Sequence, residues 1–245
     1  MAVRICHATH DERNKYHGGE AGNQGGELAE RLWYSRPWDT VLRSNDALLA
    51  IKIAEIAEKL VNCKKIGYDQ YQRTTLWKEC EKIGWNINRL DDIAPCECDC
   101  SSLIAVILHF CGVIVSKDIY TGNLTSALLN TGKFACLRDS KYLTSDRYIK
   151  TGDILLNTAH HVAVAIDDGS MASQTSATVN VNYAGVVTVS DYLNVRQTPA
   201  GSIVNLGGSP LRLPNGMVVA ICQERDGWGR LSDIQGWVSL QYIRR

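Results

Sequence analysis

Residues 101–111 constrain the fold of this chain more than any other segment, because their side chains are apolar nearly all round a predicted helix. A helix without a polar face has to be buried at the centre of a domain. Gly112 follows directly and predicts where the helix ends. Asp99 precedes it as a predicted N-cap, which places Cys100 in the first turn.

Composition narrows the class of protein around this helix. The chain has 245 residues, with 45% apolar and 21% charged side chains, which argues against disordered and fibrous classes. Its 26 basic and 26 acidic side chains give a formal net charge of zero, so no nucleic-acid partner is expected. The longest apolar run, residues 103–108, is far too short to cross a bilayer, so no membrane insertion is expected.

The pattern of the chain changes near residue 170. Before it, further helices are predicted over about 45–63 and 72–83, with short strands among them. Residues 170–183 are rich in Ser, Thr, Asn and Ala without a period, which predicts a linker. Beyond them, short strands and regular turn signals predict a small β-barrel. We therefore predict one domain over 1–169 and a second over 184–245.

Nine cysteines are many for this length, but the number is odd and the spacing irregular. A domain of this size does not need disulfides, so we interpret most of them as reduced thiols. Cys96, Cys98 and Cys100 form a run that could recruit a soft metal. No second cysteine or histidine cluster stands at zinc-finger spacing, so neither a metal nor a cofactor is expected.

Cys100 and His161 are the strongest candidates for chemistry. Unpaired amides and the helix dipole at the first turn would stabilise a Cys100 thiolate, which predicts a nucleophile with a lowered pKa. The alternative is that Cys100 is the first buried residue of a core helix. His161 opens an apolar strand and could act as general base, or it could simply face solvent at the strand entrance. His109, in the middle of the apolar helix, is interpreted as a core residue.

Three segments, taken in this order, resemble the NlpC-type papain-like cysteine peptidases of bacterial cell-wall turnover. They are Asp-Cys-Ser-Ser-Leu at 99–103, Gly-Asp-Ile-Leu at 152–155 and His-Val-Ala-Val-Ala-Ile at 161–166. The resemblance implies an α+β papain-like fold with Cys100 as nucleophile and His161 as base. It also implies substrate-binding roles for Asp99, Tyr68 and Ser101, with Asp99 attracting a substrate amino group.

The sequence departs from that family after His161. The family's third polar residue, which orients the imidazole, comes from a strand that looks missing here, because the predicted linker follows. Residues 3–9 look like that strand, so we expect a rearranged domain in which the N-terminal strand completes the sheet and His7 is the third catalytic residue. Ser173, Gln174 or a backbone carbonyl are the alternatives. The segment from 10 to 43 is similar to one found in phage and prophage lysins.

The C-terminal part resembles the bacterial SH3-like wall-binding repeats. Leu-Asn-Val-Arg-Gln-Thr-Pro at 193–199 matches their opening, and 226–231 and 236–243 match two later strands. Trp228 and Trp237 could belong either to the core of this barrel or to its ligand contacts.

Together these resemblances imply an endolysin-like peptidoglycan hydrolase, a thiol protease that cuts the γ-D-glutamyl to diamino-acid bond of stem peptides. An N-acetylmuramoyl-L-alanine amidase of the same chemistry is one alternative. A non-catalytic wall-binding protein or a thiol redox protein is another. Residues 1–5 lead into Cys6 without a signal-peptide core. We therefore expect synthesis in the cytoplasm and action on the wall after release, with a holin-type pore as the partner for that release.

Overall fold

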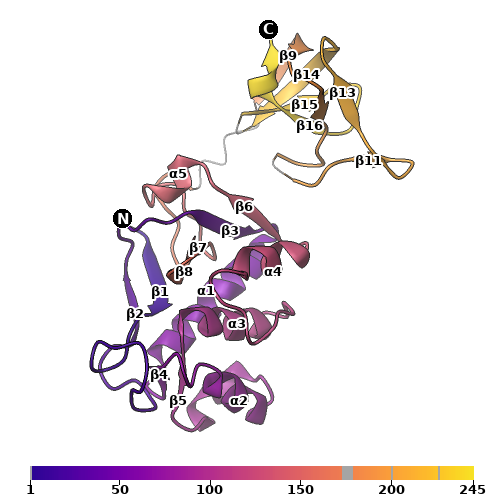
Figure 1. Cartoon of the computed structure of the whole chain (residues 1–245). Helices are drawn as coiled ribbons and strands as arrows, with labels where there is room; N and C mark the ends of the chain where they lie inside the picture. Colours follow the sequence, from indigo (N-terminus) through magenta and orange to yellow (C-terminus); the bar gives the residue numbers. More distant parts are fainter. Residues whose placement is uncertain (1, 173–178, 200, 226) are drawn as a thin grey trace. The chain divides into compact units, whose positions relative to one another are not determined.

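A computed structural model describes residues 2–172, 179–199, 201–225 and 227–245. The chain divides into two compact units, Met1–Ser173 and Gln174–Arg245 (Figure 1). The first unit mixes helices with a sheet, and the second is built from strands. Within the described residues, no helix combines the length and the apolar character that a membrane crossing requires.

A six-stranded antiparallel sheet organises the first unit, in the order β2-β1-β8-β7-β3-β6. Its strands are β1 (Arg4–Ala8), β2 (Leu28–Leu32), β3 (Thr40–Ser44), β6 (Phe134–Leu137), β7 (Ile154–Asn157) and β8 (His161–Ala165). Ile5 of β1 pairs with Ala165 of β8, and Cys6 pairs with Val164. The N-terminal strand therefore lies beside the strand that begins at His161, as the sequence predicted.

Helices cover one face of this sheet (Figure 1). They include α1 (Ala47–Asn62), α2 (Thr75–Lys82), α3 (Cys100–Phe110), α4 (Leu124–Asn130) and a 3-10 turn over Ile87–Asp92. The short α5 (Ser140–Leu143) instead packs through Tyr142 and Leu143 against the apolar cluster on the other face. A parallel pair, β4 (Ile66–Tyr68) and β5 (Cys96–Cys98), lies beside α2. The three predicted helices are confirmed as α1, α2 and α3. Every residue of α3 except His109 is buried.

The sheet is buried on both faces, and this changes what its strands look like. Cys6 and Ala8 belong to the apolar cluster beneath the helices. Val3 and Ile5 pack with Trp38 in a second cluster on the opposite face. Residues 5–8 of β1 are all buried, because both faces of the sheet are covered.

The second unit has a half-barrel sheet in the order β16-β15-β14-β9-β17. Its strands are β9 (Val179–Val187), β14 (Val218–Arg225), β15 (Trp228–Leu231), β16 (Trp237–Ser239) and β17 (Ile243–Arg244). Two short pairs accompany it: β10 (Tyr192–Asn194) pairs with β13 (Arg212–Pro214), and β11 (Asn205–Leu206) pairs with β12 (Ser209–Pro210). A 3-10 turn lies at Leu240–Tyr242. Because β9 begins at residue 179, residues 179–183 of the predicted linker are strand. Residues 173–178 lie outside the described residues.

Candidate active site

The start of α3 holds Cys100 in place through reciprocal hydrogen bonds. Asp99 Oδ1 accepts from the Ser102 amide at 2.6 Å, and Ser102 Oγ accepts from the Asp99 amide at 2.8 Å. These bonds satisfy donors that a helix leaves unpaired at its N-terminus. The predicted N-cap is confirmed, and Cys100 is the first residue of the helix.

The Cys100 sulfur lies against the beginning of β8. The backbone amides of Val162 and Ser101 lie close enough to the sulfur to act on its pKa, and the residue is 8% exposed. Val162 directly follows His161 in the chain, so this contact brings the thiol to the strand that carries the candidate base.

The thiol of Cys100 is less acidic than the sequence predicts. Burial of the sulfur and, after it, the nearby Asp99 carboxylate raise the pKa of the thiol to about 12, although the two amides and the Arg73 guanidinium act to lower it. Desolvation disfavours the thiolate more strongly than the helix terminus favours it. The expectation of a lowered pKa is therefore wrong for the protein without substrate, and Cys100 is a neutral thiol at neutral pH.

His7 and His161 form a buried pair from the adjacent strands β1 and β8. His7 Nδ1 lies 2.9 Å from His161 Nε2, and the residues are 1% and 5% exposed. Burial, followed by the His161 charge, lowers the pKa of His7 to about 3. Burial, followed by the charges of Arg36 and Arg31, lowers the pKa of His161 to about 4. Both imidazoles are therefore neutral at neutral pH.

A single proton lies between the two rings, and its position decides what His161 can do. When His161 Nε2 carries it and donates to His7 Nδ1, Nδ1 of His161 keeps a lone pair and can accept a proton. His7 is then protonated at Nε2, which is buried and has no hydrogen-bond partner among the described residues. This tautomer makes His161 a base and His7 the residue that orients it.

The predicted substrate-binding residues separate into two groups. Tyr68 is 2% exposed, and its hydroxyl accepts from Gln70 Nε2 at 3.1 Å at the edge of a cavity. Asp99 and Ser101 instead bind Arg73, whose Nε lies 2.6 Å from Asp99 Oδ2 and whose Nη2 donates to Ser101 Oγ at 2.9 Å. Neither lines that cavity, and the Asp99 carboxylate is engaged by the helix and by Arg73.

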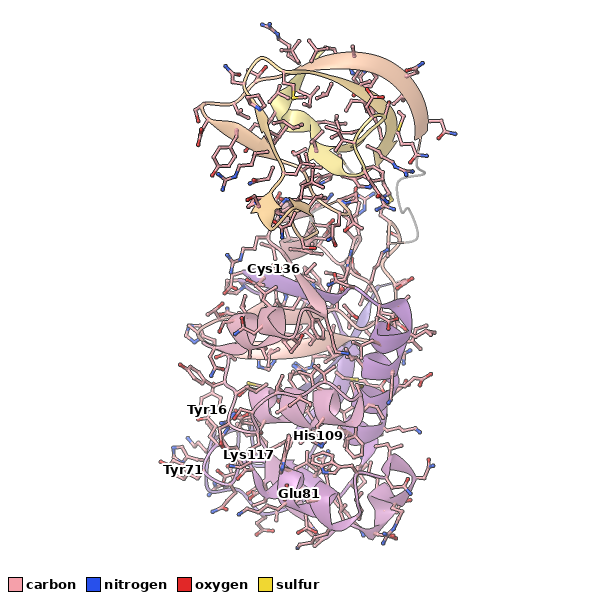
Figure 2. The ribbon with its side chains drawn as sticks, turned by 90° about the vertical axis from the view of Figure 1, so that its right-hand side faces the viewer. Tyr16, Tyr71, Glu81, His109, Lys117 and Cys136 are labelled. Carbon is pink, nitrogen blue, oxygen red and sulfur yellow. The ribbon has the colours of Figure 1, made fainter. Side chains whose placement is uncertain are left out.

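The cavity has a volume of about 480 Å³, and His161 of the histidine pair lines it. It is lined by Thr9, His10, Tyr16, Arg31, Tyr34, Arg36, Tyr68, Gln70, Ala159, His160 and His161. The exposed Tyr16 lies near Tyr71, since the Gln70 amide donates to the Tyr16 carbonyl (Figure 2). The sequence did not point to Arg31, Arg36 or Arg73, because each of these arginines meets its neighbours in the site from a distant part of the chain.

The remaining histidine and cysteine candidates lie apart from this pair. His109 packs against Trp77 and Trp85, with ring centroids at 4.7 and 3.8 Å, toward the other end of α3 (Figure 2). The thiols of Cys96 and Cys98 donate to backbone carbonyls. All nine cysteines are free. In the described ranges, no three His, Cys, Asp or Glu side chains gather in a way that could hold a metal ion. Ser173 and Gln174, the alternatives to His7, are not among those residues.

The second unit carries a groove of its own, with a volume of about 880 Å³. Tyr192, Trp228 and Tyr242 line it together with Arg196. Arg196 lies over the Trp228 ring, 6.0 Å from its centroid. Trp237, by contrast, is 9% exposed and does not line the groove. Of the two tryptophans that the sequence left open, Trp228 borders the groove and Trp237 is buried.

Comparison with known proteins identifies the first unit. Residues 5–172, more than half of the chain, match the family described as endolysin-like domain. Membership of this family indicates a lytic enzyme that acts on peptidoglycan. Neither the curated proteins nor the solved structures give a match. With its paired histidines and cavity within the matched residues, this chain belongs to the endolysin-like domain family.

Proposed function

We propose that the protein is a cysteine hydrolase that cleaves an amide bond in the stem peptide of peptidoglycan. The observation that carries this proposal is the packing of α3, which begins at Cys100, against β8, together with the 2.9 Å separation of the His161 and His7 ring nitrogens. A nucleophile, a base and an orienting group in this sequence of contacts are the parts that acyl transfer requires. The NlpC-type motif around Cys100 adds to this support.

The first half of the reaction forms a thioester. Because the thiol and His161 are both neutral, the Cys100 proton passes to His161 as the sulfur attacks the substrate carbonyl. The amide of Cys100, in the first turn of α3, is a donor for the developing oxyanion. His161 then gives its proton to the leaving nitrogen, and the carbon–nitrogen bond breaks to release an amine.

The second half restores the enzyme. His161 accepts a proton from water as the water oxygen attacks the thioester carbonyl. The carbon–sulfur bond breaks, the acid product leaves, and the proton returns to the Cys100 sulfur. His7 holds the His161 ring in one tautomer through both halves. His7 is therefore our proposal for the third catalytic residue.

We propose the γ-D-glutamyl to diamino-acid bond as the one that is cut, with the bond between the muramic lactyl group and L-Ala as the alternative. For the second unit we propose an SH3-like domain that binds the wall. Its groove combines aromatic rings with Arg196, which suits peptide and sugar contacts. Binding there would raise the local concentration of the catalytic unit on the wall.

The proposal is tested by digesting purified peptidoglycan of several chemotypes with the wild type and with Cys100→Ala, followed by mass spectrometry. We expect fragments from the wild type and none from the variant, and the new termini identify the bond. Cys136→Ala is the matched control and should retain activity, because Cys136 lies on β6, at the opposite end of the strand order from β1 and β8.

Release by Cys100→Ala at the wild-type rate would overturn the cysteine mechanism. If no protein releases fragments from any wall, while the wild type still sediments with it, the chain is a wall-binding protein. A disulfide that forms reversibly on mild oxidation, without any hydrolysis, would favour the thiol redox alternative.

A further inference from the structure

The cavity beside the histidine pair holds two cations without a counter-charge. Arg31 and Arg36 both line it, and none of the described residues that line it is Asp or Glu. Neither guanidinium forms an ion pair with a carboxylate within the described part of the chain. Their charges reach the active site, because both arginines contribute to the lowered pKa of His161.

Arg31 reaches this cavity from the edge strand β2. His7 pairs with Ala29, and Ile5 pairs with Arg31, so Arg31 lies two residues along β2 from the partner of His7. Side chains two residues apart in a strand share one face of the sheet. Arg31 therefore projects on the face that carries His7, and it is exposed at the cavity.

Arg36 lies in the segment that follows β2 and packs around the histidines. Its Nη1 donates to Tyr34 Oη at 3.4 Å, and the Tyr34 ring lies 6.2 Å from the ring of His7. Its Nε is buried and has no hydrogen-bond partner among the described residues. A buried donor without an acceptor is costly, and a carboxylate is the group whose geometry matches a guanidinium edge.

We propose that Arg31 and Arg36 form a carboxylate-binding subsite, so that the enzyme selects stem peptides with a free carboxylate close to the scissile amide. This inference rests on the proposed function and deepens it. A carboxylate in the cavity would satisfy Arg36 Nε and neutralise part of the charge that faces His161. Arg31, which lines the same cavity, would complete the binding of the same group.

The subsite distinguishes between the two candidate bonds. In a γ-glutamyl peptide the side-chain carboxyl forms the scissile amide, which leaves the α-carboxylate of the same residue free beside it. The bond between a lactyl group and L-Ala has no such carboxylate on its acyl side. Amidation of the glutamyl α-carboxylate removes the charge with little change in shape, so it provides a matched substrate.

The test compares two synthetic tripeptides, L-Ala-γ-D-Glu-diaminopimelate and its α-carboxamide counterpart. For the wild type we expect kcat/KM to be at least about tenfold higher with the carboxylate peptide, mainly through KM. In Arg36→Gln and Arg31→Gln this ratio should fall toward one. Lys52→Gln, which removes an exposed charge from α1, is the control and should keep the wild-type ratio.

Calorimetry of the two peptides with the Cys100→Ala variant measures binding at the subsite without catalysis. Carboxylate-dependent binding that Arg36→Gln abolishes in this background would support the subsite even if no peptide were hydrolysed, in which case the proposed function alone would fail. Equal binding of both peptides, or a preference that survives both arginine substitutions, would overturn the subsite. Thermal unfolding of each variant identifies losses that come from misfolding.

Discussion

Two electrostatic effects oppose each other at Cys100. The first turn of α3 offers backbone amides that stabilise a thiolate, and the amides of Val162 and Ser101 act to lower the pKa of Cys100. Burial and the Asp99 carboxylate favour the neutral thiol, and they prevail. In the mechanism that we propose, nucleophilic attack would therefore depend on proton transfer to His161 during the reaction rather than on a preformed thiolate.

The alkylation of Cys100 by iodoacetamide tests this balance. Because the pKa of the thiol is raised, to about 12, the thiolate fraction grows with pH across the whole range from 7 to 10. We expect the labelling rate, followed by peptide mass spectrometry, to rise throughout that range without a plateau. Asp99→Asn keeps a side chain that can cap the helix and removes one charge, so it should lower the pKa. A plateau below pH 9 in the wild type would contradict the neutral thiol.

The role of His7 is tested by two substitutions that differ in one hydrogen bond. In His7→Asn the side-chain oxygen can still accept from His161 Nε2, whereas His7→Ala leaves that donor unpaired in a buried site. We expect His7→Ala to lower kcat by at least about tenfold and His7→Asn to retain more activity. If His7→Ala stays within a few-fold of the wild type, the third role belongs elsewhere.

If His161 is the base that we propose, its protonation sets the lower pH limit of activity. Because the pKa of His161 is lowered to about 4, its base form persists above that pH and is lost as the pH falls through it. The profile of kcat/KM for His7→Asn, compared with that of the wild type, shows whether His7 contributes to this position.

At the scale of elements, the site depends on the order of strands in the sheet. Cys100 comes from the start of α3, His161 from the start of β8 and His7 from β1. The two histidines are 154 positions apart in the sequence, and the pairing of their strands brings them together. The hydrogen-bonded pairing of β1 with β8 is therefore a requirement of the site as well as of the sheet.

The turn before β7 has the least freedom to change. Gly152 has a φ of +80°, and a Cβ there would overlap the backbone carbonyl of Ala50 in α1. The next residue is Asp153, whose Oδ1 accepts a hydrogen bond from Nε of Arg43 in β3 at 2.8 Å. This turn thus positions β7 against both α1 and β3.

Replacing Gly152 by Ala should destabilise the first unit by about 3 kcal/mol or more, because backbone strain and a steric overlap add. Gly132→Ala is the matched control: it has a φ of +69° but nothing within 4 Å of a Cβ, so only the strain remains, about 1 kcal/mol. Chemical denaturation followed by tryptophan fluorescence measures both. Similar losses of stability in the two variants would show that the backbone around Ala50 shifts to accommodate the new Cβ.

At the scale of the molecule, each unit has its own core. The two apolar clusters of the first unit contain only residues up to 166, and the cluster of the second begins at Val181. We therefore expect each unit to fold alone, and the second to contribute binding rather than chemistry.

A fragment of residues 1–173 tests this division of roles. It should hydrolyse a soluble stem peptide with the kcat/KM of the full chain, because the cavity and the histidine pair belong to this fragment. On intact walls at low enzyme concentration it should be slower, by roughly tenfold or more, because it lacks the second unit. Equal rates on intact walls would exclude a wall-binding role for that unit.

The sequence by itself determined the features that depend on neighbouring residues. The cap at Asp99, the buried helix that follows and the strand that starts at His161 are all local patterns, since capping and hydrophobic periodicity act over a few residues. The resemblance of short motifs extended this to a peptidoglycan hydrolase and to His7 as a partner of His161.

Only the tertiary structure decided the features that depend on distant contacts. Arg73 holds Asp99 from 26 residues away, and Arg31 and Arg36 reach a cavity shared with Tyr68. The pKa of Cys100 is raised because packing removes water from its sulfur, whereas the local pattern left open whether this thiol was buried or activated. Desolvation and long-range charge are properties of the packed chain, so they could not be predicted from the residues that flank each group.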